Sequence, residues 1–169
     1  MLKLTNVKID WPALWEKKAF DETSTPKYEA TFMVPKDSKD VPALLAAVQE
    51  AKDKFGKKIP DDKVFAMADG DESEVDRYKG HWIVKAKNKG RVKVEDRRRD
   101  PVTEDDELIY AGATVTALIR VYGPKPGDKF KYVSAQLLAV QFVSHGEPFG
   151  PSVNLDEYFE DLGDDDADY

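Results

Sequence analysis

The 169-residue chain contains no cysteine and only two histidines, His81 and His145. Without thiols it has no disulfide framework, no thiolate zinc site and no cysteine nucleophile. Neither histidine has a partner at Glu-x-x-His or His-x-x-x-His spacing, so we interpret both as surface or strand-end residues. The chain also lacks a Gly-x-x-x-x-Gly-Lys-Ser/Thr phosphate loop and a Gly-x-Ser-x-Gly nucleophile elbow. We therefore predict a protein that is not an enzyme and that binds no metal or cofactor.

Long apolar runs are missing as well. No stretch approaches the ~20 residues that span a bilayer, and the start, Met-Leu-Lys-Leu-Thr-Asn, lacks the apolar run of a signal peptide. We expect a soluble cytoplasmic protein with no membrane partner. If a phage encodes the chain, this is the host cell cytoplasm.

The last fifteen residues contain no lysine or arginine but carry eight of the 33 carboxylates. The other 25 acids almost balance the 26 bases, so a body of about +1 precedes a tail of −8. Blocks of like charge resist folding and commonly serve as interaction tails. We predict one domain over residues 1–154 and a disordered acidic tail over 155–169. The tail residues predicted to bind a partner are Asp156, Glu157, Glu160, Asp161, Asp164, Asp165, Asp166, Asp168 and Tyr169.

Strand patterns dominate the body. Apolar and polar residues alternate over 27–34, 81–89 and 112–122, and a longer strand over 130–143 is apolar on both faces in its second half. The Asn-Lys-Gly turn after the second of these strands predicts a hairpin with 91–95.

One helix is expected at about 41–56. Its apolar stripe has helical spacing, Pro42 suits the first turn, Asp40 is the expected N-cap and Gly56 the expected end. The stripe comprises Val41, Leu44, Val48, Ala51 and Phe55. Five strands with a helix inserted after the first predict a mainly β fold, an OB-fold-like five-stranded barrel.

Two acidic connectors, 69–76 and 103–107, are expected to be exposed loops. The first carries Asp69, Asp71, Glu72, Glu74 and Asp76, which a Mg²⁺-dependent nuclease could use. Two-metal sites need carboxylates that converge from rigid elements, which neighbours in one loop seldom provide. We therefore favour the solvated loop over the metal site.

Basic residues share one register across the predicted hairpin, and aromatic residues lie on neighbouring strands. Cations bind phosphates without sequence preference, and aromatic rings stack on bases in single-strand binders. The candidate DNA-binding residues are Lys85, Lys87, Lys89, Arg91, Lys93, Arg120, Lys131, Tyr122, Tyr110 and Trp82. The alternating lysines are equally typical of a solvated face or a protected edge, and Trp82 is also expected in the core.

Several segments of the chain resemble a family of tailed-phage single-stranded DNA-binding proteins that is distantly similar to the T7-type protein. The segments that carry this likeness are 15–20, 27–36, 80–87, 109–115, 137–142 and 146–150. The charged connector from Arg97 to Glu107 departs from the family pattern. The resemblance implies an OB-fold that coats single strands during phage DNA replication, recombination and repair. It also implies an acidic tail that recruits a polymerase, a helicase or another replication protein. Related proteins often dimerise, so a homodimer is among the partners considered.

The tail can occupy the basic groove when DNA is absent, because carboxylates and phosphates compete for the same lysines. A rival interpretation from another class is an acidic protein-interaction module, such as a DNA mimic that occupies a DNA-binding enzyme. The net charge of −7 supports that alternative.

Overall fold

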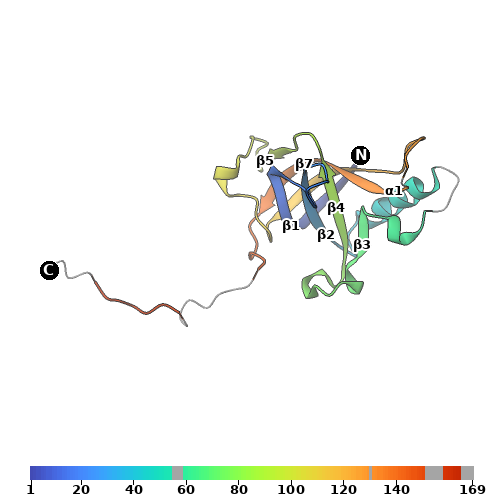
Figure 1. Cartoon of the computed structure of the whole chain (residues 1–169). Helices are drawn as coiled ribbons and strands as arrows, with labels where there is room; N and C mark the ends of the chain where they lie inside the picture. The colour runs from blue at the N-terminus through green and yellow to red at the C-terminus, as the bar shows by residue number, and fades with distance from the viewer. Residues whose placement is uncertain (55–58, 130, 151–157, 165–169) are drawn as a thin grey trace.

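The computed structural model describes residues 1–54, 59–129, 131–150 and 158–164, and it shows a β-barrel with a helix packed beside it (Figure 1). The strands are β1 Leu2–Lys18, β2 Lys27–Pro35, β3 Met67–Asp69, β4 His81–Asn88, β5 Lys93–Glu95, β6 Thr114–Tyr122 and β7 Ser134–Ser144. The helix is α1 Val41–Asp53, and the 3-10 turns are η1 Asp61–Lys63, η2 Gly70–Glu72, η3 Asp76–Tyr78 and η4 Glu104–Asp106.

Five of the strands close into a barrel. β1 pairs antiparallel with β2 and β6, β2 pairs with β4, and β6 pairs with β7. A parallel pairing between β4 and β7, with Lys87 opposite Gln136, joins the two ends. The predicted fold class, an OB-like five-stranded barrel with one helix, is therefore confirmed.

Alternation of apolar side chains along the strands fills the barrel. Phe32 of β2, Val84 of β4, Val115 and Ile119 of β6 and Leu137 of β7 are all fully buried. Each such side chain contributes about 1.5–3 kcal/mol by leaving water. The apolar faces of the strands predicted over 27–34, 81–89 and 112–122 thus point into the core.

The first barrel strand, β1, was missed by the sequence analysis. Its buried residues Leu4, Val7 and Ile9 do not keep one period, because the strand is interrupted where Asn6 and Trp11 have φ of +53° and +48°. The pairing register shifts at both places. Each bulge reverses the face that the following residues present, so the period-2 pattern is lost.

The predicted hairpin between 81–89 and 91–95 is wrong. β5 pairs in parallel with β7, with Val94 opposite Val140, and does not pair with β4. The Asn88 side chain turns the chain away from β4 by donating to Leu137 O at 2.7 Å and accepting from Gly90 N at 2.9 Å. The five-strand count was right because β1 takes the place that the hairpin strand was expected to fill.

The helix matches its prediction over 41–53, and Val41, Leu44, Val48 and Ala51 of its stripe are buried. It follows the second barrel strand, because β1 precedes β2. Asp40 is the N-cap residue, as predicted, but its side chain makes no capping bond; its Oδ2 instead accepts a hydrogen bond from Thr5 N at 2.7 Å. The predicted Phe55 contact and the stop at Gly56 lie outside the described residues.

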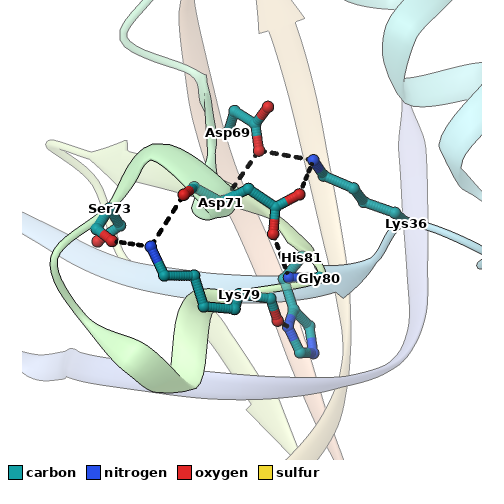
Figure 2. Close-up of polar contacts among 7 residues, drawn as sticks. All are labelled: Lys36, Asp69, Asp71, Ser73, Lys79, Gly80 and His81. Carbon is teal, nitrogen blue, oxygen red and sulfur yellow. Dashed lines mark hydrogen bonds and ion pairs between the residues drawn. The ribbon is translucent and has the colours of Figure 1, made fainter.

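The first acidic connector is an ordered arm, residues 69–80 (Figure 2), in which Asp71, Glu72, Glu74 and Asp76 are exposed as predicted. Lys36 Nζ lies 2.6 Å from Asp69 Oδ1 and 2.5 Å from Asp71 Oδ2, while the other oxygen of Asp71 accepts from Gly80 N at 2.7 Å. Lys79 Nζ closes the arm on itself by donating to Asp71 O at 2.9 Å. These bonds tie the arm to the end of β2.

The hydrogen bonds to Lys36 hold the pKa of Asp69 and of Asp71 below the ordinary aspartate value and raise the pKa of Lys36. Both carboxylates therefore serve as acceptors for an ammonium group and for backbone N–H. The second connector, 103–107, is exposed as predicted and forms a turn in which Thr103 N donates to Asp106 Oδ2 at 2.8 Å. Among the described residues, no helix has the length and apolar character needed to cross a bilayer.

Candidate nucleic-acid interface

A long groove runs over the outer faces of β2 and β4. It consists of two adjoining openings of about 720 and 850 Å³ that share Lys27, Lys87 and Lys89. The first continues along the end of β6 and the loop after it, and the second lies between the β1–β2 connection and the arm. We call this surface the cationic groove. Its size is in the range of sites that hold organic ligands.

The strand pairing explains why cations gather here. Lys85 and Lys87 point away from the core, because Val84 and Ala86, which alternate with them along β4, are fully buried. The cations that line the groove are Lys18, Lys27, Lys54, Lys85, Lys87, Lys89, Arg120 and Lys125. Among its described lining residues the one carboxylate is Glu29, 3.6 Å from Lys87 Nζ. The groove therefore carries a strong local positive charge on a chain whose total is −7.

Aromatic rings stand at both ends of the groove. Tyr122, 42% exposed, lies at one end beside Arg120, whose Nη2 donates to Gln136 Oε1 at 2.7 Å. Trp11 and Phe20 line the other end and are 68% and 92% exposed. Open rings beside cations are the arrangement that single-stranded nucleic acids use, with bases on the rings and phosphates on the cations.

The end that carries Trp11 is built around one buried carboxylate, Asp10, whose side chain is 3% exposed. Asp10 Oδ2 accepts from Arg77 Nη2 at 2.6 Å and from the Tyr78 hydroxyl at 2.6 Å, and Oδ1 accepts from Trp11 N at 2.9 Å. The pKa of Tyr78 is raised to about 12, mainly because the phenol is buried and secondly because it donates a hydrogen bond to Asp10. The bond to Asp10 also raises the pKa of Arg77, whose guanidinium lies 5.0 Å from the Phe149 ring centre.

The structure brings five of the candidate residues into the groove: Lys85, Lys87, Lys89, Arg120 and Tyr122. It places the other five outside the residues that line it. Arg91 and Lys93 line a separate cleft with Leu14, Trp15 and Tyr28, which we call the β5 cleft. They are separated from the other lysines because β5 pairs with β7.

Lys131, Tyr110 and Trp82 have structural partners instead. Lys131 Nζ donates to Asp128 O at 2.9 Å, and the Tyr110 hydroxyl donates to Gly146 O at 2.9 Å. Trp82 packs half-buried against the core, with Lys36 Nζ 4.8 Å from its ring centre.

Six groove residues were missing from the sequence-based candidates: Trp11, Lys18, Phe20, Lys27, Lys54 and Lys125. One local signal was available for two of them. The run Lys17-Lys18-Ala19-Phe20 places an aromatic ring two residues after a pair of lysines. Trp11 had no such signal, since only the bulge in β1 exposes its ring.

Of the acidic tail, the structure describes residues 158–164, all of which are exposed. They include Glu160, Asp161 and Asp164, and also three large apolar side chains, Tyr158, Phe159 and Leu162. The other tail candidates, Asp156, Glu157, Asp165, Asp166, Asp168 and Tyr169, lie outside the described residues.

Comparison with known proteins gives consistent matches along the chain. The profile of the family described as "Enterobacter phage Enc34, ssDNA-binding protein" matches residues 1–169. A curated relative, "Putative protein p50" of Acyrthosiphon pisum secondary endosymbiont phage 1, is 34% identical, with 95% of this chain and 93% of the relative covered.

Solved structures show the same similarity. The single-stranded DNA-binding protein from bacteriophage Enc34 in complex with ssDNA has a TM-score of 0.76 and 26% identity, covering 88% of each chain. Another structure of the single-stranded DNA-binding protein from bacteriophage Enc34 has a TM-score of 0.72 and 25% identity, covering 94% of this chain and 89% of the other. Gp2.5, a single-stranded DNA-binding protein encoded by bacteriophage T7, has a TM-score of 0.65 at 12% identity, covers 96% of each chain, and shares the fold.

Proposed function

Because this chain belongs to the single-stranded DNA-binding protein family of Enterobacter phage Enc34, we propose that it coats single-stranded DNA without regard to sequence. The observation that carries this proposal is the cationic groove, where eight lysine and arginine side chains meet a single carboxylate among the described lining residues. The similar Enc34 protein was solved in complex with ssDNA, which supports the same ligand for this chain.

The groove suits a single strand by its chemistry. Lysines and arginines neutralise phosphates and release counterions, which makes the affinity independent of sequence and sensitive to salt. A single strand can turn its bases onto Tyr122, Phe20 and Trp11, each stacked base contributing ~1–3 kcal/mol. In a duplex the bases already stack on one another, so these rings would add little.

The proposed biological role rests on the family to which the chain belongs. In this proposal the protein coats single strands exposed during phage DNA replication, recombination and repair in the host cytoplasm. Residues 1–154 are the binding domain in this proposal, and a homodimer is compatible with it.

The tail, 155–169, has two roles in the proposal. Its eight carboxylates compete with phosphates for the groove, since both are anions that the same lysines attract. When DNA displaces the tail, the released carboxylates and Tyr169 recruit a polymerase, a helicase or another replication protein.

A gel shift with labelled oligo-dT at 50 and 200 mM salt tests the proposal. We expect a shift that weakens steeply at the higher salt and a weaker shift with duplex of equal length. No shift at either salt, together with capture of a DNA-binding enzyme, would instead support the DNA mimic. Incubation of the same oligonucleotide with Mg²⁺ or Mn²⁺ should leave it intact, whereas cleavage stopped by a chelator would indicate a nuclease.

A further inference from the structure

Trp11 has a backbone conformation that its side chain disfavours. It lies in the β1 bulge at φ +48°, in the left-handed region that large residues rarely occupy. Its indole is nevertheless 68% exposed, so burial of the ring does not compensate for this conformation. Disfavoured backbone of this kind persists only where surrounding contacts hold it, and it concentrates at functional sites.

Asp10 supplies those contacts. One carboxylate oxygen accepts from Trp11 N at 2.9 Å, which holds the backbone at the positive-φ residue of the bulge. The other oxygen accepts three donors from the arm: Arg77 Nη2 at 2.6 Å, Arg77 Nε at 3.1 Å and the Tyr78 hydroxyl at 2.6 Å. A single buried side chain thus joins the backbone of Trp11 to the arm.

The arm and Trp11 form the same end of the cationic groove. Ser73, Val75 and Tyr78 of the arm line it together with Trp11 and Lys18. The arm is held at its other side by Lys36, which bonds Asp69 and Asp71 (Figure 2). The wall of the groove is therefore rigid before any ligand arrives, and its one strained residue presents an open ring beside cations.

We propose that Trp11 is a preorganised base-stacking platform and that Asp10 is the positioning residue that holds it in place. The inference rests on the proposed function. It specifies which ring stacks on a base and which residue holds that ring in position. Preorganisation matters because a ring already held in its binding position loses little conformational entropy when a base stacks on it.

A double-mutant cycle on the full-length protein tests the pair. Trp11→Leu should weaken oligo-dT binding about fivefold, the lower end of the effect of losing one stacked base. Asp10→Asn should weaken it by a similar factor, because the amide keeps one acceptor oxygen, so its NH2 group must face either the Trp11 N–H or the donors of Arg77 and Tyr78. The double variant should bind about as well as either single variant, since Asp10 acts through Trp11; independent effects would multiply to about 25-fold.

Phe65→Leu is the matched control, because Phe65 is an exposed aromatic outside the groove lining and its loss should leave binding unchanged. Wild-type affinity in Trp11→Leu, or multiplied losses in the double variant, would overturn the inference. If wild-type protein shifts oligo-dT in a salt-sensitive way while Trp11→Leu binds equally well, only the inference fails. If the wild type does not bind, the proposed function fails with it.

A second measurement does not depend on Asp10→Asn folding. In a Trp15→Phe/Trp82→Phe protein the sole remaining tryptophan is Trp11. Stacking on a base should quench its emission as oligo-dT is added, with the same midpoint as the gel shift. Emission unchanged at saturating oligo-dT would contradict the platform.

Discussion

Two regions of the molecule place lysines and arginines beside aromatic rings, the cationic groove and the β5 cleft. In the groove the rings are open, with Trp11 and Phe20 68% and 92% exposed. In the β5 cleft the rings are half-buried and engaged: Trp15 Nε1 donates to Val102 O at 3.4 Å, and Lys17 Nζ lies 5.5 Å from the Tyr28 ring centre. The two regions therefore differ in charge, with eight cations lining the groove and two lining the cleft, and they differ as well in whether their rings are available to a ligand.

The two regions also differ in what holds their edges. The groove wall depends on Asp10, a buried acceptor that collects donors from β1 and the arm. The edge of the β5 cleft includes Glu95, which pairs at 3.0 Å with Arg99, a side chain 75% exposed. Exposed pairs of this kind contribute about 0–1 kcal/mol, less than hydrogen bonds to a buried carboxylate such as Asp10.

The largest expected contrast comes from removing charge in each region. Lys27→Gln/Lys87→Gln/Lys89→Gln should weaken oligo-dT binding about a hundredfold near 0.1 M salt and lower the salt slope by about 2, since each single-strand phosphate contact accounts for ~0.7. Arg91→Gln/Lys93→Gln is the control and should change neither quantity. Equal losses in both variants, measured by titration at three or more salt concentrations, would remove the distinction between groove and cleft.

The loss of stability at high pH should depend on the groove wall, which contains Tyr78, and not on the edge of the β5 cleft. The pKa of Tyr78 is raised from 10.0 to about 12, so the unfolded chain ionises this phenol while the folded protein keeps it neutral. Its contribution, about 3 kcal/mol, is complete below pH 10 and is lost as pH rises toward 12. Denaturant unfolding should show that loss in the wild type and a smaller one in Tyr78→Phe. Glu95→Gln, at the edge of the β5 cleft, should keep the wild-type loss, and identical curves for wild type and Tyr78→Phe would refute the assignment.

Loss of the ring at the other end of the groove should have a moderate effect. Tyr122→Ala should weaken oligo-dT binding about tenfold, within the ~1–3 kcal/mol typical of a stacked base. Tyr122→Trp, which keeps an aromatic face, should bind nearly as well as the wild type. An unchanged dissociation constant in Tyr122→Ala would exclude this ring from the site.

The smallest expected change follows deletion of residues 155–169. If the tail competes for the groove, its removal should tighten oligo-dT binding about fivefold at low salt, a modest coupling between two ligands of one site. The gain should shrink as salt rises and should disappear in the groove charge variant. A truncated protein that binds no more tightly at low salt would show that the tail does not shield the groove.

The fold class could be predicted from the sequence because most strands bury one face. Burial of one face makes apolar and polar residues alternate along the strand, and this pattern is visible in the sequence. The faces of β2, β4 and β6 and the stripe of α1 were all identified from this pattern. β1 was not predicted because two positive-φ residues interrupt its alternation of apolar and polar side chains. A bulge has no sequence pattern by which it could be recognised in a single sequence.

The candidate site was predicted only in part, for a related reason. Lys85 and Lys87 could be assigned to an exposed face, because their strand continues on both sides of them. Arg91 and Lys93 continue the odd-numbered series of Lys85 and Lys87. The chain, however, leaves β4 at Asn88, and the next strand, β5, pairs with β7 instead of β4. Strand pairing is a long-range choice, and no local period specifies it.

Local composition and periodicity determined three properties of this protein: a β-rich body, one amphipathic helix, and an anionic end that follows a nearly neutral domain. Tertiary structure decided which cations share a surface, and it turned an acidic connector into the wall of that surface. It also exposed Trp11 through a bulge stabilised by Asp10 and by donors nearly 70 residues further along the chain. The physical reason is that alternation reflects burial of a residue within its own strand, whereas a binding groove forms where strands distant in sequence become neighbours.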